Sequence, residues 1–251
     1  MTHVTRFAFR LTLAALALSA TTALAGTRAV PQVDPISVSP TVTPLDLGPA
    51  SVQSTCTLGV TGAPAFLVNY LLPPNDGYYT LIDPAQCTAC PLGIVTPVKA
   101  HALLNWRGLC TQPVSVGIYG ATGGPGCYSP DPSVVICAPV TFNVSVPAAG
   151  NYDISFPLAS GCCLNQPVFL KIEFVSASNG CSTSTTIPRL ITTGACDQPC
   201  TSWNIYPGGF DDLCDPIIGF PGNPIMNLEV DCCTATPTHQ RSWGTLKSHY
   251  R

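Results

Sequence analysis

The chain has 251 residues, of which 9% are charged and 46% are hydrophobic, and it carries a formal net charge of −3. So little basic charge excludes a nucleic-acid-binding surface, because such surfaces need clustered Lys and Arg. The apolar fraction excludes a disordered chain. With 26 prolines, 21 glycines and 14 cysteines, the composition is rich in turn formers and predicts an all-β domain held by disulfides.

Residues 1–25 have the features of a secretory signal peptide. Arg6 and Arg10 precede the apolar stretch 11–20, and Ala23 and Ala25 form an A-x-A cleavage site. A membrane anchor is the alternative, but the stretch is shorter than the roughly 20 apolar residues that span a bilayer. We expect a mature chain that starts at Gly26, is secreted to the cell surface or medium, and has no transmembrane segment.

Residues 26–54 contain five prolines and no periodicity. They predict an extended, proline-rich leader, part of which can pair as an edge strand.

Residues 55–233 alternate short apolar runs with turn clusters. In residues 98–106, Val98, Ala100, Ala102, Leu104 and Trp106 share one face, and residues 152–156, 168–174 and 226–232 alternate in the same way. Period-two alternation marks strands with one buried face. We expect nine or ten such strands in one antiparallel, jelly-roll-like β-sandwich, stapled by disulfides.

Residues 234–251 form a Thr/Pro spacer followed by a basic peptide. The body from 26 to 233 has five Lys or Arg against 13 Asp or Glu, a net charge of 5 − 13 = −8. The tail carries Lys247 and Arg251 beside an apolar stripe of Trp243, Leu246 and Tyr250 at helical spacing. A stripe that ten residues cannot bury alone predicts a sorting or docking peptide with its own binding partner.

All cysteines follow the predicted cleavage site, and their number is even. Such a set in a secreted chain predicts disulfides: Cys56, Cys87, Cys90, Cys110, Cys127, Cys137, Cys162, Cys163, Cys181, Cys196, Cys200, Cys214, Cys232 and Cys233. Adjacent cysteines point to opposite faces of a strand, so each member of the pairs 162–163 and 232–233 is expected to have a different partner. Cys127 and Cys137 bracket a proline-rich loop that a bridge between them would close.

Cys87 and Cys90 form a C-x-x-C motif, which can also hold zinc or run redox chemistry. Zinc needs four ligands in tetrahedral reach, and the chain offers no second pair at that spacing. A thioredoxin-like pair needs a helix N-terminus, whereas prolines flank this pair between two expected strands. We interpret both as structural half-cystines.

Two candidate binding features adjoin in residues 203–215. Asp211, Asp212 and Asp215 crowd one loop, and a solvated acidic turn is the favoured interpretation. The alternative is that they hold a structural calcium ion, and no other cofactor is expected. Trp203, Tyr206 and Phe210 lie beside them. Aromatic rings next to acids suit a polysaccharide or cell-surface partner, although Trp203 alone would serve equally as a core residue.

Catalytic motifs are absent from the sequence. His101 is the only body histidine, and Glu173 and Glu229 lie on expected outward strand faces. The sequence therefore favours a non-enzymatic extracellular surface, matrix or binding module. A carbohydrate-binding module is the first alternative and a secreted hydrolase the second.

The chain also resembles a known group of proteins. The tail pattern W-G-x-x-K-x-x-Y-R and the body segments YYTLIDPAQC, CTSWNIY and GFPGNPI are similar to uncharacterised Cys-rich secreted β-modules of environmental bacteria. The resemblance implies secretion and a sorting role for the tail, and it brings no known activity.

Overall fold

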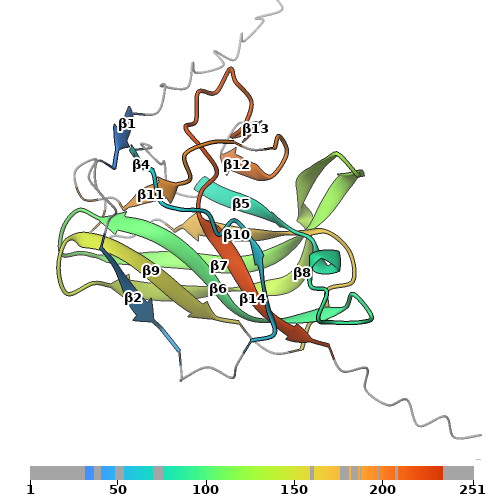
Figure 1. Ribbon diagram of the computed structural model, residues 1–251. Helices are drawn as coiled ribbons and strands as arrows, with labels where there is room; N and C mark the ends of the chain where they lie inside the picture. The colour runs from blue at the N-terminus through green and yellow to red at the C-terminus, as the bar shows by residue number, and fades with distance from the viewer. Residues whose placement is uncertain are drawn as a thin grey trace, which may run out of the picture.

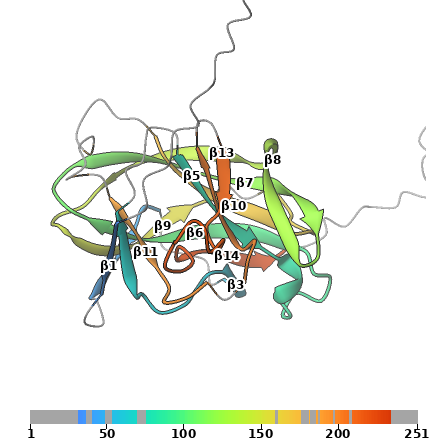
Figure 2. The same ribbon diagram turned by 90° about the horizontal axis from the view of Figure 1, so that it is seen from above.

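A computed structural model describes residues 32–36, 41–48, 54–69, 76–158, 161–175, 181, 186, 188–196, 198–206 and 209–233. The predicted signal peptide and the C-terminal tail lie outside these residues. Within them the chain forms an antiparallel-rich β-sandwich of two sheets packed face to face (Figures 1 and 2). The described part contains no helix long and apolar enough to cross a membrane.

The first sheet is built around one long central strand, β6. Its strands are β1 (Gln32–Pro35), β2 (Val42–Asp46), β3 (Cys56–Gly59), β4 (Phe66–Asn69), β6 (Val95–Trp106), β9 (Gly150–Pro157), β11 (Arg189–Thr192) and β14 (Met226–Cys232). One edge of β6 pairs with β9, and β9 pairs with β2. The other edge pairs first with β14 and then with β11, so the sheet forks there into a β14–β3 arm and a β11–β4–β1 arm.

The second sheet is antiparallel throughout. In order across the sheet it consists of β13 (Gly209–Asp212), β12 (Ser202–Tyr206), β5 (Asp76–Ile82), β10 (Val168–Phe174), β7 (Thr111–Gly124) and β8 (Cys127–Ser145). A single 3-10 turn, η1 (Pro84–Gln86), follows β5. The layered arrangement is clearest from above (Figure 2).

The core lies between the sheets and follows the predicted alternation. Its fully buried members include Ala100, Leu104 and Trp106 on β6, together with Ile154 on β9 and Leu228 on β14. The prediction was wrong for Val98, which is only half-buried. The pairing of β6 with β14 skips this residue in a bulge, and a bulge changes the face on which the preceding residues lie.

The described residues form 14 strands rather than nine or ten. The additional strands are short: β1, β3, β4, β11 and β13 have four residues each. A four-residue strand is too short to show alternation in the sequence. Tertiary pairing with a longer neighbour is what defines it.

Two strands, β1 and β2, come from the segment expected to form a leader. β2 pairs in parallel with β9, and Asp46 at its end forms an ion pair with Lys99 of β6. β1 is tied to the sheet through Arg189, which donates to Asp34 Oδ2 at 2.8 Å and to Asn105 Oδ1 at 2.9 Å. Side-chain contacts therefore join both strands to the strands at the centre of the sheet.

All 14 cysteines are paired, which confirms the predicted framework. The bridges are Cys56–Cys87, Cys90–Cys232, Cys110–Cys181, Cys127–Cys200, Cys137–Cys162, Cys163–Cys233 and Cys196–Cys214. Adjacent cysteines do take different partners, and Cys87 and Cys90 are half-cystines. The expectation that Cys127 pairs with Cys137 was wrong, because β8 carries both residues in one extended strand. Their side chains are therefore too far apart along the chain to meet.

We expect no free thiols in the native protein when thiols are counted in denaturant without reductant. The loop closed by Cys110–Cys181 spans 71 residues and that closed by Cys196–Cys214 spans 18. Replacing the first pair by alanine should cost about 4 kcal/mol and the second about 3 kcal/mol in urea unfolding, because a longer loop restricts the unfolded chain more. Four or more free thiols together with bound zinc would instead restore a metal role for Cys87 and Cys90.

Candidate functional site

A cavity of about 310 Å³ lies where the first sheet forks, and we call it the fork pocket. Its walls come from the chain after β3, the end of β5 and the 3-10 turn, the end of β11, and the segments before β12 and β14. The lining residues are Gly59, Val60, Thr61, Gly62, Leu81, Gln86, Thr193, Gln198, Thr201 and Asn223. The pocket therefore draws on both sheets and on five separate parts of the chain.

Thr193, which follows β11, and Asn223, which precedes β14, join the two arms of the sheet at the wall of the pocket. Thr193 N–H donates to the Asn223 carbonyl at 2.9 Å, and Asn223 N–H donates to Thr193 Oγ1 at 3.0 Å. A Cβ at Gly222 would lie 2.1 Å from the Thr193 carbonyl oxygen, so only glycine allows this approach. Gly59 has φ +105° and turns the chain away at the end of β3.

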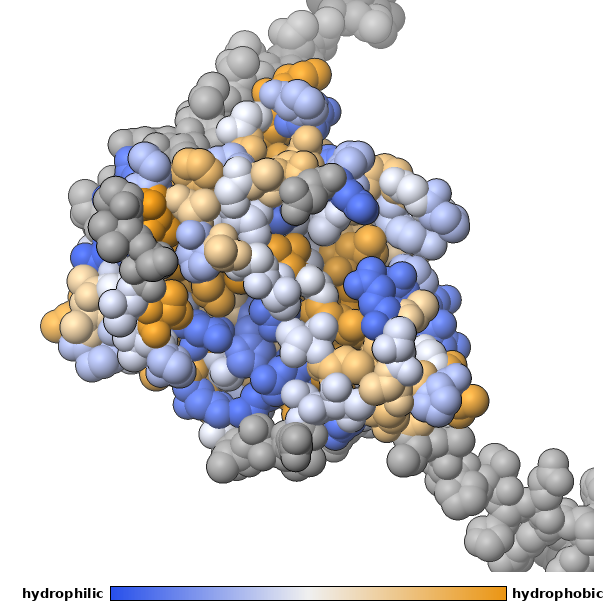
Figure 3. All heavy atoms as spheres, in the orientation of Figure 1, coloured by the Kyte–Doolittle hydropathy of each residue, from blue (hydrophilic) through white to orange (hydrophobic). Residues whose placement is uncertain are grey.

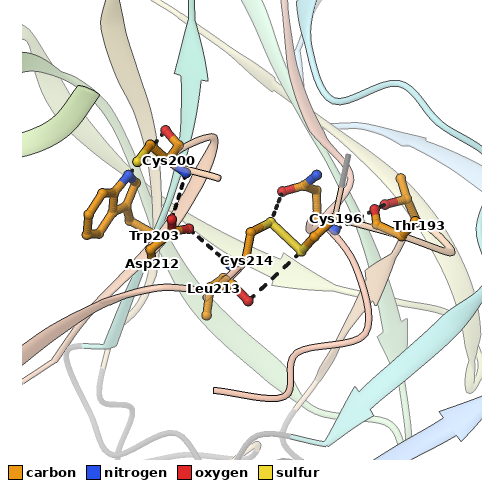
Figure 4. Close-up of a disulfide and its surroundings, with 9 residues drawn as sticks. Thr193, Cys196, Cys200, Trp203, Asp212, Leu213 and Cys214 are labelled. Atoms are coloured by element: carbon orange, nitrogen blue, oxygen red, sulfur yellow. Dashed lines mark hydrogen bonds between the residues drawn. A yellow bond between two sulfur atoms is a disulfide. The ribbon is translucent and has the colours of Figure 1, made fainter. Parts of the chain in front are cut away.

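Two exposed amide side chains of the pocket stand beside disulfides. Gln86 ends the 3-10 turn, where the Asp83 side chain accepts the Ala85 N–H at 3.0 Å, and its neighbour Cys87 is bonded to Cys56 on β3. Gln198 lies between Cys196 and Cys200, which are bonded to Cys214 and to the β7–β8 hairpin. Figure 4 shows the Cys196–Cys214 bridge lying between Asp212 and Thr193. Both glutamines are thus carried on covalently held loops.

None of the described lining residues of the fork pocket is charged. Three carry amides, three carry threonine hydroxyls, and Leu81 and Val60 add apolar surface. The sequence analysis missed this site, because neutral polar residues in separate loops form no motif. The only local indication of the pocket is that residues 59, 62 and 222 are glycines, at positions where the backbone comes close to a neighbouring segment.

The predicted aromatic site, residues 203–210, follows the pocket residues Gln198 and Thr201 in the chain and is mostly buried. Trp203 is 9% exposed and donates its indole N–H to the Tyr128 carbonyl at 3.1 Å. It belongs to a second core on the outer face of the second sheet with Tyr79, Tyr119 and Phe169. Phe210 is 57% exposed, and its ring centroid lies 5.4 Å from that of Trp203.

The β7–β8 hairpin covers the second core and is fastened to Cys200 through Cys127. Tyr206 lies on β12, and its side chain falls outside the described residues, as do Trp243, Leu246, Lys247, Tyr250 and Arg251 of the tail. Of the three predicted aromatic residues, Phe210 presents an exposed ring. Ligand binding by these rings stays a prediction.

The three predicted calcium ligands do not converge in the described structure. Asp212 accepts the backbone N–H of Cys200 at 2.7 Å through one oxygen and that of Cys214 at 3.0 Å through the other. Asp215 accepts the N–H of Ile217 at 2.9 Å. Among the residues that the structure describes, no group of three or more His, Cys, Asp or Glu side chains is placed to hold a metal. Asp212 has a structural role in this loop, and the calcium ion remains a prediction.

His101 is the centre of a charged cluster on the outer face of the first sheet, where Figure 3 shows a hydrophilic patch below the centre. Its Nδ1 lies 3.1 Å from Asp153 Oδ1 and 3.3 Å from Ser155 Oγ, and its Nε2 lies 3.2 Å from Glu229 Oε1. The Glu229 contact is an ion pair that falls short of hydrogen-bond geometry. His101 thus joins β9, β6 and β14.

This arrangement differs from a catalytic Ser-His-Asp triad. In a triad the serine and the aspartate contact opposite ring nitrogens, whereas here Ser155 and Asp153 both face Nδ1. The second glutamate, Glu173, lies on the other sheet in an ion pair with Lys171. The two glutamates therefore do not flank a common cleft, as the carboxyl pair of a glycosidase must.

No protein-family model matches this chain, and no curated protein or solved structure is significantly similar to it. Its function must therefore follow from the chemistry of its own surfaces.

We expect the protein to be more stable at pH 5 than at pH 8 because of His101. Burial alone lowers the pKa of His101, but the hydrogen bond to Asp153 and the charges of Asp153 and Glu229 raise it above 6.5. The stabilisation is complete below about pH 6.5, the value in the unfolded chain, and it is lost as pH rises through the raised folded value. His101→Gln should flatten the profile of urea unfolding measured at several pH values. An unchanged profile would contradict the role of this histidine.

We expect Asp212→Ala to destabilise the protein by about 2–4 kcal/mol, because two partly buried N–H groups lose a charged acceptor. This loss should appear equally in calcium and in chelator.

If Asp211, Asp212 and Asp215 also share an ion, calcium raises the melting temperature of the native protein, and Asp212→Asn reduces the rise. Identical melting temperatures of the native protein in calcium and in chelator would show that no calcium ion is bound.

Proposed function

We propose that this protein is a secreted, non-enzymatic binding module that works outside the cell, with the fork pocket as its ligand site. The observation that carries the proposal is the pocket's uncharged, hydrogen-bonding lining on disulfide-held loops. Amides and hydroxyls can orient a polar ligand, and a rigid loop loses little entropy when it binds. Among the described lining residues none carries a carboxylate, imidazole or thiol that would act as an acid, base or strong nucleophile.

An extracellular location agrees with the disulfide framework. Seven bridges persist in an oxidising compartment and would be reduced in a typical cytosol. The predicted signal peptide supplies the route of export, and the body's net charge of −8 keeps the folded domain soluble there.

A screen of melting temperatures tests the pocket. Uncharged polar compounds, charged analogues of them and apolar compounds would each be added to the native protein. We expect only uncharged polar compounds to raise the melting temperature, by about 3–6 °C at ten times Kd. Gln198→Trp, which places a large side chain in an exposed loop position, should melt normally without ligand and lose the shift. If the ligand still raises the melting temperature of this variant, the binding site lies outside the fork pocket.

The tail completes the proposal as a sorting or docking peptide. Its basic charge is opposite to that of the body, and a Thr/Pro spacer separates it from β14. Deletion of residues 236–251 should leave the melting temperature unchanged and alter release or surface retention in the native host. A melting temperature lowered by several degrees with unchanged localisation would instead make the tail part of the fold.

A further inference from the structure

We infer that the fork pocket takes one neutral sugar ring, either free or as a unit of a polysaccharide. The inference rests on the proposed binding function and names the ligand class of that site. The polar side chains of the lining can both donate and accept hydrogen bonds. Each amide of Gln86, Gln198 and Asn223 combines a donor with an acceptor, and the hydroxyls of Thr61 and Thr201 can do both. The Thr193 hydroxyl is already engaged, because it accepts the Asn223 N–H and donates to the Ala195 carbonyl. Sugar hydroxyls are likewise donor and acceptor at once, so they can satisfy both halves of an amide.

Charge narrows the class further. Burying an ionised group without an opposite charge is costly, and the described lining supplies neither a cation nor a carboxylate. An anionic ligand would also approach a body with a net charge of −8. Phosphorylated, sulfated or uronic acid ligands are therefore disfavoured, and so are amino sugars with a free ammonium group. Neutral polyols remain.

Size and shape agree with a single ring. Small-molecule sites are clefts of roughly 300–1,000 Å³, so a site for a single sugar ring should lie near the lower end of that range. The cavity of about 310 Å³ holds such a ring with a few bridging waters. Leu81 supplies apolar surface for the C–H groups of one ring face.

The disulfides hold the backbone that carries the two exposed amides before the ligand arrives. Gln86 is next to Cys87, and Gln198 lies between Cys196 and Cys200. The Cys196–Cys214 bridge also touches the pocket wall, where Asn223 Oδ1 lies 3.0 Å from Cys214 Sγ. A site whose backbone is already ordered loses less entropy on binding, which raises its affinity for a ligand that fits.

Calorimetric titration of the full secreted chain tests the inference. The probes are glucose, galactose, mannose and xylose, with glucuronate, glucosamine and a capped neutral dipeptide for comparison. We expect at least one neutral sugar to bind, the charged sugars to bind at least tenfold more weakly, and Gln86→Ala and Gln198→Ala each to weaken binding about 2–12-fold. Gln166→Ala is the matched control, because this exposed glutamine lies outside the pocket lining, and it should change nothing.

Sedimentation with insoluble neutral polysaccharides separates free sugar from polymer. Retention that both pocket variants weaken supports recognition of a sugar unit in a chain, even without measurable monosaccharide binding. Retention that neither variant changes overturns the inference. Binding of the dipeptide with the same dependence on Gln86 and Gln198 also overturns it and leaves the proposed binding function standing. If no probe of any class binds to the pocket, both fail.

Discussion

The covalent connection of neighbouring cysteines is the constraint on which the structure depends. Cys56 on β3 is bonded to Cys87, and Cys90, three residues later, is bonded to Cys232 on β14. The adjacent Cys233 is bonded to Cys163, and its neighbour Cys162 to Cys137 on β8. Four bridges therefore run in one series from the first sheet to the second. Successive bridges in this series are linked only by the short backbone segments 87–90, 232–233 and 162–163.

A second series of two linked disulfides lies beside the fork pocket and the second core. Cys214 is bonded to Cys196, and Cys200, four residues later, is bonded to Cys127 at the tip of the β7–β8 hairpin. The segment between Cys196 and Cys200 thus serves two structures at once. Gln198 within it lines the fork pocket, and Trp203 after it anchors the second core. Loops without regular structure would otherwise be mobile, so these bridges give the pocket a fixed shape.

Electrostatics has a smaller part in this fold than covalent bonds and packing. The few charged side chains occur in local clusters: His101 with two acids on the first sheet, Lys171 with Glu173 on the second, and Arg189 with Asp34 at β1. Lys171 also lies 5.7 Å and 5.3 Å above the rings of Tyr79 and Tyr119. The His101 and Arg189 clusters join different strands of the first sheet, whereas Lys171 and Glu173 both lie on β10 and only the ring contacts of Lys171 reach β5 and β7. The described lining of the fork pocket contains no member of these clusters.

The sequence by itself determined the fold class, the disulfide framework and most of the buried face of those strands that alternate at period two. Alternation at period two and an even set of cysteines are local signals, and both need only neighbouring residues to be recognised. Tertiary structure alone decided which cysteines pair, where the β6 bulge lies, that Trp203 is buried, and that residues 59, 86, 198 and 223 line one cavity. The reason is physical: pairing, burial and cavities depend on distances between segments far apart in the chain, and those distances exist only once the two sheets have packed.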